Sequence, residues 1–318
     1  MTSKTGLALA GTGAAVLGTL AYGALVEKNN FVLRHERVPI LDAGSAPIRV
    51  LHLSDIHMAP WHTDAISWIA ALATLKPDLV VGTGDFLGHP RGLSALTEAL
   101  LPFAGTPGVI THGSNDRVAP RFVNPLGYLF KPSEVPHHGD PLDFEGLVDL
   151  YTNILGWKDV DNQTTRLTIN GSTLDVVGVG DAHDNLDDVS LVPELLDELR
   201  ENPDGLHDEP HSSVVTIGVT HAPYRRVLDT FVTNATEIIF AGHTHGGQVC
   251  LPNGRALTTN CDLPTDQAGG LSVWRHAQRA SYLHVSRGLG TSVWAPFRLF
   301  CPPEATLVTL VGDDIGYA

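Results

Sequence analysis

The chain has 318 residues, of which 43% are hydrophobic and 17% charged, and its formal net charge is −15 at pH 7. This composition suits a globular protein with one large core, and the acidic balance argues against a protein that binds nucleic-acid duplexes. An acidic protein that handles anionic substrates needs a local positive centre, which bound dications can supply.

The N-terminal segment 6–26 contains no charged residue and follows Lys4. A run of about 20 residues is long enough to span a hydrocarbon core, although Gly, Ala and Thr make this one only moderately apolar. We interpret residues 1–30 as a single membrane anchor with its linker, and 31–318 as a catalytic domain outside the cytoplasm. A cleaved export signal ending near 21–23 is the alternative, and a polar linker is expected at 27–36.

Strands and helices alternate in the first half of the body. The apolar patterns predict strands at 48–54, 78–83 and 108–112, with helices at 61–75 and 92–103 between them. This alternation is typical of a parallel sheet with crossover helices, and therefore of an α/β fold. Residues 120–146 are rich in Pro, Gly and His, which indicates a long surface excursion.

The second half continues with a hairpin at 164–180, for which Asn170-Gly171 is a strong turn signal. Helices are expected at 186–200 and 224–232. The remaining predicted strands are 213–219, 237–241, 281–286 and 305–311. The cysteines Cys250, Cys261 and Cys301 lack metal-site spacing; the first two either pair or stay free.

Metal-ligating side chains follow five of the predicted strands. Residues i and i+2 of an extended segment point the same way, so His243 and His245 can aim at one point, and the glycines around them let the backbone approach closely. Parallel strands bring their carboxyl ends to one edge, where ligands bind. The candidate ligands, in chain order, are Asp55, His57, Asp85, Asn115, His221, His243 and His245.

Carboxylate, imidazole and amide ligands suit Mn, Fe, Zn or Mg rather than a thiolate site. Seven ligands exceed one tetrahedral shell and fit two divalent ions bridged by a carboxylate. Centres of this kind neutralise phosphoryl oxygens and supply a bridging hydroxide that attacks phosphorus in line. The pattern therefore predicts phosphoester hydrolysis.

The sequence resembles the calcineurin-like metallophosphoesterases over residues 48–312. Five blocks carry the resemblance, in order: SDIH at 54–57, GD at 84–85, GSND at 113–116, THAP at 220–223 and GHTH at 242–245. The segments SRGLG at 286–290 and RLFCPPE at 298–304 are similar to the membrane-associated bacterial branch of that family.

The resemblance implies a four-layer αββα sandwich and a partition of the ligands between two ions. Asp55, His57, Asp85 and His245 would hold the first ion. Asp85 (bridging), Asn115, His221 and His243 would hold the second. Asp55, Asp85, Asn115 and His243 are the residues that we expect to be catalytic.

One block departs from the family, which usually reads Gly-Asn-His followed by an acid. Here GSND leaves either Asn115 or Ser114 at the ligand position, and we favour Asn115 because an amide oxygen binds metals better than a neutral hydroxyl. The family histidine is missing, so the general acid is open, with His112 and His183 as substitutes. Residues 124–139, which include Lys131, His137 and His138, are candidates for a cap over the site. Arg117 and Arg121 are candidates for contacts to the substrate phosphate.

We therefore expect a dinuclear metal-dependent phosphodiesterase or pyrophosphatase at the cell membrane, acting on a lipid-linked or envelope phosphoester. Two alternatives stay open. One is a non-catalytic metal-binding scaffold of the same fold, which would bind two ions without hydrolysis. The other is a mononuclear zinc hydrolase, which would bind one ion and would not need Asp85 as a bridge. The oligomeric state is not predicted.

Overall fold

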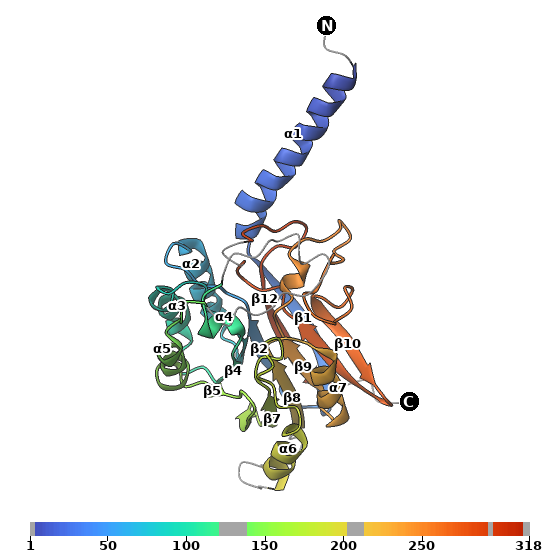
Figure 1. Ribbon diagram of the computed structural model, residues 1–318. Helices are drawn as coiled ribbons and strands as arrows, with labels where there is room; N and C mark the ends of the chain where they lie inside the picture. The colour runs from blue at the N-terminus through green and yellow to red at the C-terminus, as the bar shows by residue number, and fades with distance from the viewer. Residues whose placement is uncertain (1–3, 121–138, 202–212, 292–294, 314–318) are drawn as a thin grey trace.

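Two sheets packed face to face, with helices on both outer faces, form the body of the computed structural model (Figure 1). The structure describes residues 4–120, 139–201, 213–291 and 295–313. The layers run helix, sheet, sheet, helix. This arrangement confirms the expected four-layer αββα sandwich.

The first sheet is mainly parallel and carries the first three predicted strands at its centre. The strand β2 pairs parallel with β3, and β3 pairs parallel with β4, so their carboxyl ends share one edge. Its six strands, in spatial order, are β1 (Val32–Leu41), β12 (Glu304–Gly312), β2 (Ile48–Leu53), β3 (Leu79–Thr83), β4 (Gly108–Thr111) and β5 (Lys158–Asp159).

The second sheet also has three parallel neighbours at its centre, β7, β8 and β9, so their carboxyl ends share one edge as well. The expected hairpin forms its edge, and Asn170 and Gly171 take the positive φ angles of 50° and 82° that a tight hairpin turn needs. The six strands, in spatial order, are β10 (Gly270–His276), β11 (Arg279–Val285), β9 (Ile238–Ala241), β8 (Val214–Thr220), β7 (Ser172–Gly178) and β6 (Thr164–Ile169).

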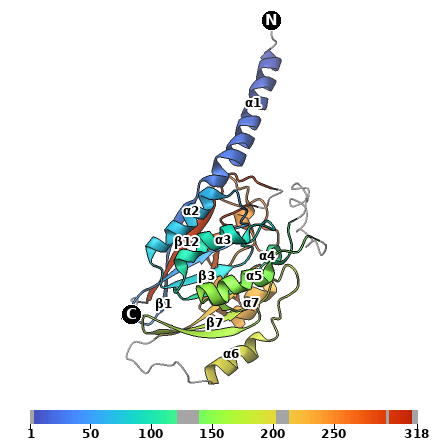
Figure 2. The same ribbon diagram turned by 90° about the vertical axis from the view of Figure 1, so that its left-hand side faces the viewer.

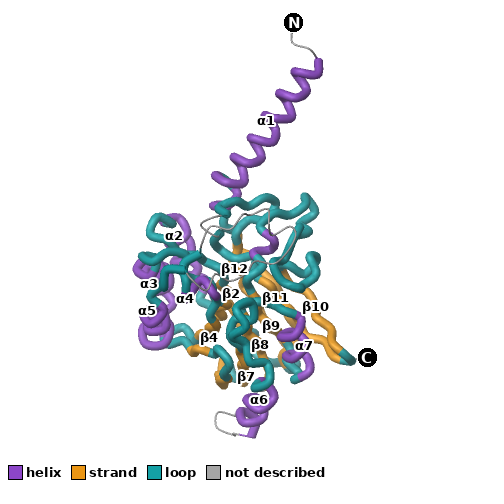
Figure 3. Tube along the Cα trace, in the orientation of Figure 1, coloured by secondary structure: helices purple, strands orange, loops and turns teal. Residues whose placement is uncertain are grey.

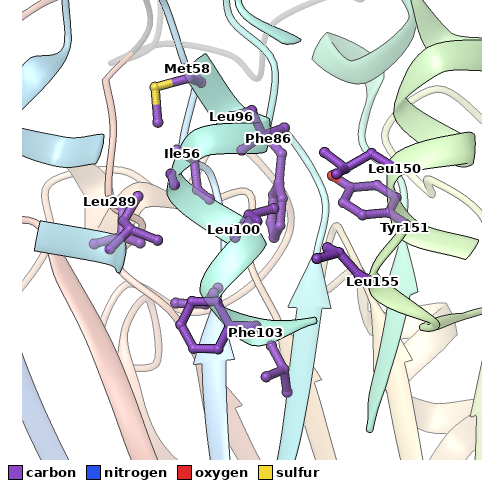
Figure 4. Packing of buried hydrophobic residues seen from close by; sticks show 14 of the residues in the cluster. Ile56, Met58, Phe86, Leu96, Leu100, Phe103, Leu150, Tyr151, Leu155 and Leu289 are labelled. Carbon is purple, nitrogen blue, oxygen red and sulfur yellow. The ribbon is translucent and has the colours of Figure 1, made fainter. Parts of the chain in front are cut away.

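Helices cover the outer faces of both sheets, as Figure 2 shows for the first sheet. The helices α2, α3 and α5 pack there around Phe86, Phe103 and Tyr151 (Figure 4), while α6 and α7 pack on the second sheet around Phe231. A third apolar cluster, with Val81 and Ile217, fills the space between the sheets. The helix bounds are α2 (Thr63–Leu72), α3 (Leu93–Leu100), α4 (Ser114–Arg117), α5 (Phe144–Asp149), α6 (Val192–Glu201) and α7 (Arg225–Thr233).

Two expectations about the body need correction. The segment expected to be a polar linker at 27–36 instead starts the strand β1, which pairs parallel with β12 over almost its whole length. Its charged residues, such as Arg34 beside Glu304 of β12, hid the strand pattern. The helix expected at 186–200 begins only at Val192, because Asp187 and Asp188 are held in loop contacts.

The N-terminal helix α1 (Lys4–Leu25) extends from one end of the body, as Figure 3 shows. No helix among the described residues combines the length and the apolarity that a membrane crossing needs. The expectation of a single N-terminal anchor, with a catalytic domain beyond the membrane, is therefore wrong. The many Gly, Ala and Thr residues of α1 provide the length of a span without its hydrophobicity.

Candidate metal centre

Loops that follow the carboxyl ends of strands in both sheets meet around a group of buried side chains that can bind metals. Every one of the seven predicted ligands makes a contact with at least one other. Two clusters have ligating atoms within 4.8 Å of one another, Asp55–His57–His245 and Asp55–Asp85–His221. The Asn115 side chain contacts Asp85, whereas His243 contacts Asp55 through its backbone amide, with its ring centroid 5.3 Å from that of His221.

The first cluster joins the loop after β2 to the loop after β9. His57 Nε2 lies 3.1 Å from His245 Nε2. Asp55 Oδ1 lies 3.4 Å from the same His245 atom. Asp55 and His57 are buried, and the His245 side chain is 12% exposed. Ring nitrogens and a carboxylate oxygen thus face a common point, an arrangement that suits a cation.

Asp85 belongs to the second cluster and also lies near His57 of the first. Its Oδ2 is 3.7 Å from His57 Nε2 and 3.6 Å from His221 Nε2. The Asn115 backbone amide donates to Asp85 Oδ1 at 2.8 Å, and Asn115 Nδ2 donates to Oδ2 at 2.7 Å. A half-turn of this amide group would present its oxygen at the same place. The structure therefore brings Asn115, rather than Ser114, into contact with the shared carboxylate.

Hydrogen bonds fix which nitrogen each imidazole presents. His221 Nδ1 lies 2.6 Å from the Thr83 carbonyl oxygen and donates to it, which leaves Nε2 buried without a hydrogen bond among the described residues and 3.6 Å from Asp85 Oδ2. His243 Nε2 donates to the Asn260 carbonyl at 3.2 Å, so Nδ1 is left as its lone-pair nitrogen. Carbonyl partners of this kind orient metal-binding histidines. The residues therefore fit a pair of bound cations.

The backbone at the site is held in an unusual conformation. Five of the seven predicted ligands, none of them glycine, have φ angles between 45° and 67°. Such left-handed conformations cost energy and concentrate at functional sites. The buried Asp116 carboxylate supports this geometry by accepting the backbone amides of Asp85, Phe86 and Gly113. The five ligands are Asp55, His57, Asp85, His243 and His245.

Burial controls the protonation of these groups. It raises the pKa of Asp55 to about 7 and lowers the pKa of His57 to about 4. Burial also disfavours the charged form of His221, but the carboxylates of Asp85, Asp181 and Asp55 outweigh it and raise that pKa to about 10. The His221 proton thus compensates part of the buried negative charge, a task that a cation can take over.

The two candidate general acids occupy different environments. His112 is buried away in a separate cluster, with Nε2 3.0 Å from Asp159 Oδ2 and its ring against Phe144. The His183 ring lies 4.4 Å from the His243 ring, and its Nδ1 is 3.0 Å from Tyr224 Oη. Of the two, only His183 adjoins a predicted ligand.

Arg117 also has partners of its own. It stacks over Phe144 at 3.9 Å and lies 3.4 Å from Asp161 Oδ2. Arg121 and residues 124–138 of the expected cap lie outside the described residues.

Two functional candidates escaped the sequence reasoning. Asp181 is 1% exposed, its Oδ2 has no partner among the described residues, and it raises the pKa of His221. The Gly180-Asp181 pair after β7 repeats the Gly-Asp pattern after β3, and this signal could have revealed it. Arg298 is fully buried behind His245, with Nη2 3.4 Å from Nδ1, and it donates to the carbonyls of Arg287 and Gly290.

The cysteines are free, so the considered pairing of Cys250 with Cys261 is absent. Cys250 lies instead beside Cys301; the Cys250 thiol donates to the Gly246 carbonyl at 3.1 Å, and the Cys301 thiol lies 3.3 Å from its nearest acceptor, the His245 carbonyl. They support the loop that carries His245.

Comparisons with known proteins identify similar sequences and structures. The sequence model of a family described as "Calcineurin-like phosphoesterase" matches residues 48–247, a range that contains all seven ligands. The chain is 26% identical over 323 residues to phosphodiesterase YaeI of Escherichia coli (strain K12), covering 95% of this chain and 97% of that protein. It is 25% identical over 275 residues to the uncharacterized protein YpbG of Bacillus subtilis (strain 168), covering 85% and 84%. TT1561 of Thermus thermophilus is similar in structure, with a TM-score of 0.43 and 11% identity over 77% of this chain and 91% of that chain.

We expect Mn²⁺ binding to release protons and to strengthen as the pH rises. His221, with a pKa of about 10, is protonated at neutral pH and must lose that proton before Nε2 binds a cation. Below its pKa of about 7, Asp55 adds a second competing proton. Calorimetric titration in buffers of different ionisation enthalpy measures the release. An affinity that stays constant between about pH 6 and about pH 9 would contradict this account.

Proposed function

The chain belongs to the calcineurin-like phosphoesterase family and is a metal-dependent phosphoester hydrolase, and we propose that it is a dinuclear phosphodiesterase or pyrophosphatase. The observation that carries the proposal is the position of Asp85 Oδ2, about equally far from His57 Nε2 (3.7 Å) and His221 Nε2 (3.6 Å). A carboxylate between two sets of imidazoles suits a bridge between two ions. The similar phosphodiesterase YaeI supports the diesterase alternative.

We assign the ligands according to these contacts. The first ion would be held by Asp55, His57, Asp85 and His245. The second would be held by Asp85, Asn115, His221 and His243. Asp55 belongs to both clusters of nearby ligating atoms, but its Oδ1 is turned toward His245, which supports its place in the first set.

Two divalent ions held by these residues would neutralise phosphoryl oxygens and would supply a hydroxide nucleophile at neutral pH. The chain's own contribution is orientation. The Thr83 and Asn260 carbonyls fix the rings of His221 and His243, and Asp116 holds the loop that carries Asp85. Because these groups are buried and fixed before substrate arrives, little reorganisation is needed during the reaction.

Protonation of the leaving group is the weak point of this site. The family histidine is missing from GSND, and His112 is bonded to Asp159. Burial and the neighbouring His221 lower the pKa of His183 to about 4, so its ring is neutral at neutral pH and is a poor proton donor. We therefore infer substrates whose leaving group departs without full protonation, such as phosphoanhydrides or aryl diesters.

Replacing Asp85 by Asn tests the shared carboxylate. We expect Asp85→Asn to lower Mn²⁺-dependent hydrolysis of bis-p-nitrophenyl phosphate by at least about 100-fold, because the bridging charge contributes several kcal/mol. The matched control is Asp159→Asn, which removes a carboxylate bonded to His112 outside the site and should leave activity near that of the wild type. Equal activity in the two variants would refute the assignment of Asp85.

A series of diesters with different leaving groups tests the missing general acid. We expect kcat/KM to fall steeply from bis-p-nitrophenyl phosphate to diphenyl phosphate, because the more basic phenoxide needs a proton that the site supplies poorly. Steady-state kinetics with Mn²⁺ at neutral pH measures the trend. Similar kcat/KM values for both esters would show that a general acid is present after all.

A further inference from the structure

A row of polar side chains crosses the otherwise apolar space between the two sheets. His284 of β11 belongs to the second sheet, and its Nδ1 lies 2.8 Å from Nδ1 of His52 in β2 of the first sheet. His52 Nε2 in turn lies 2.9 Å from the hydroxyl of Thr83, the last residue of β3. The two sheets therefore share a hydrogen-bonded polar contact in their common core.

The row continues to a predicted metal ligand. The Thr83 hydroxyl donates to Ser54 Oγ at 2.7 Å, and Ser54 Oγ donates to Asp55 Oδ2 at 2.5 Å. All of these side chains are at most 1% exposed. We call this row the polar chain, and it consists of His284, His52, Thr83 and Ser54.

Simple proton counting gives the polar chain a direction. An ionised Asp55 can only accept, and each hydroxyl has one proton, so Ser54 donates to Asp55 and Thr83 donates to Ser54. Thr83 must then accept from His52 Nε2–H, which leaves His52 Nδ1 to accept from His284 Nδ1–H. The last atom, His284 Nε2, should be a bare acceptor. It has no hydrogen-bond partner among the described residues, which fits this direction because the reverse one would bury an N–H without an acceptor.

Burial keeps both imidazoles neutral, which the direction also needs. It lowers the pKa of His284 to about 3 and holds the pKa of His52 well below its usual value. Neutral rings have one donor and one acceptor nitrogen each.

We propose that the polar chain positions Asp55, holding Oδ2 so that Oδ1 faces the first ion; this rests on the proposed function, in which Asp55 is a metal ligand. Oδ1 is the oxygen that lies 3.4 Å from His245 Nε2. The backbone amide of His243 contacts both oxygens and lies nearer to Oδ2, at 3.0 Å, than to Oδ1, at 3.2 Å. Partners that orient a metal-binding carboxylate typically change metal affinity about 10- to 100-fold when removed.

Gly242 provides separate support. A Cβ at this position would lie 2.0 Å from Ser54 Oγ, 2.6 Å from Asp55 Oδ2 and 3.0 Å from Thr83 Oγ1. The space that any other residue would need is filled by the polar chain and its acceptor. The glycine before His243 thus lets the β9 loop close onto the chain.

Thr83→Val removes one hydroxyl while keeping the side-chain shape and the carbonyl that binds His221. We expect the full-length variant to bind Mn²⁺ about 10- to 100-fold more weakly than the wild type, and Thr83→Ser to restore affinity. Thr306→Val is the matched control, because Thr306 pairs with His52 in the neighbouring strand, is 1% exposed, and has a hydroxyl without a partner among the described residues. Circular dichroism checks that each variant folds.

Wild-type affinity in Thr83→Val, or an equal loss in Thr306→Val, would overturn the proposal. Failure of the wild type itself to bind Mn²⁺ would instead refute the proposed function.

A measurement on the metal-free wild type keeps the test independent of variant folding, provided that the pH lies well above the Asp55 pKa of about 7, so that this carboxylate is ionised and can only accept. Histidine ¹⁵N chemical shifts should show the Nε2–H tautomer for His52 and the Nδ1–H tautomer for His284. The opposite tautomer at His52 would mean that the polar chain does not donate toward Asp55, and it would overturn the proposal.

Discussion

Negative charge buried at the meeting point of two sheets is the constraint on which the rest of this structure depends. Asp55 and Asp85 are at most 3% exposed, and burial of an uncompensated carboxylate is costly. A protonated His221 and backbone amide donors compensate this negative charge, while His57 stays neutral. Such a site is prepared for cations, and the fold delivers its ligands from the ends of strands in both sheets.

The meeting of the candidate ligands at one place could be predicted because each follows a strand and falls into a compact motif. The alternation of apolar runs and helices predicted a parallel sheet with crossover helices, whereas the four-layer sandwich was expected from the resemblance to a known family. The strand β1 could not be seen, since its pairing with β12 joins distant parts of the chain and includes charged residues such as Arg34. The expectation of a membrane anchor in α1 was wrong because it relied on the length of the uncharged segment more than on its apolarity.

Polar contacts between residues far apart in the chain could not be predicted from the sequence either. His52 and His284 are 232 residues apart and look like ordinary strand residues until the sheets are stacked. Asp181 is a functional candidate because it is buried near His221 and raises the pKa of that histidine, although its Gly-Asp pattern was visible in the sequence. These cases share a cause, which is that burial and contact partners arise only when the two sheets pack. Motifs reveal the candidate ligands, whereas the groups that orient these side chains emerge from tertiary structure.

The account joins backbone strain, buried charge and the polar chain into one arrangement around two cations. Anomalous diffraction from crystals grown with Mn²⁺ tests this claim most directly. The account predicts two peaks, one near Asp55, His57 and His245 and the other near His221 and His243, with Asp85 contacting both. A single peak, or two peaks that do not share Asp85, would contradict it.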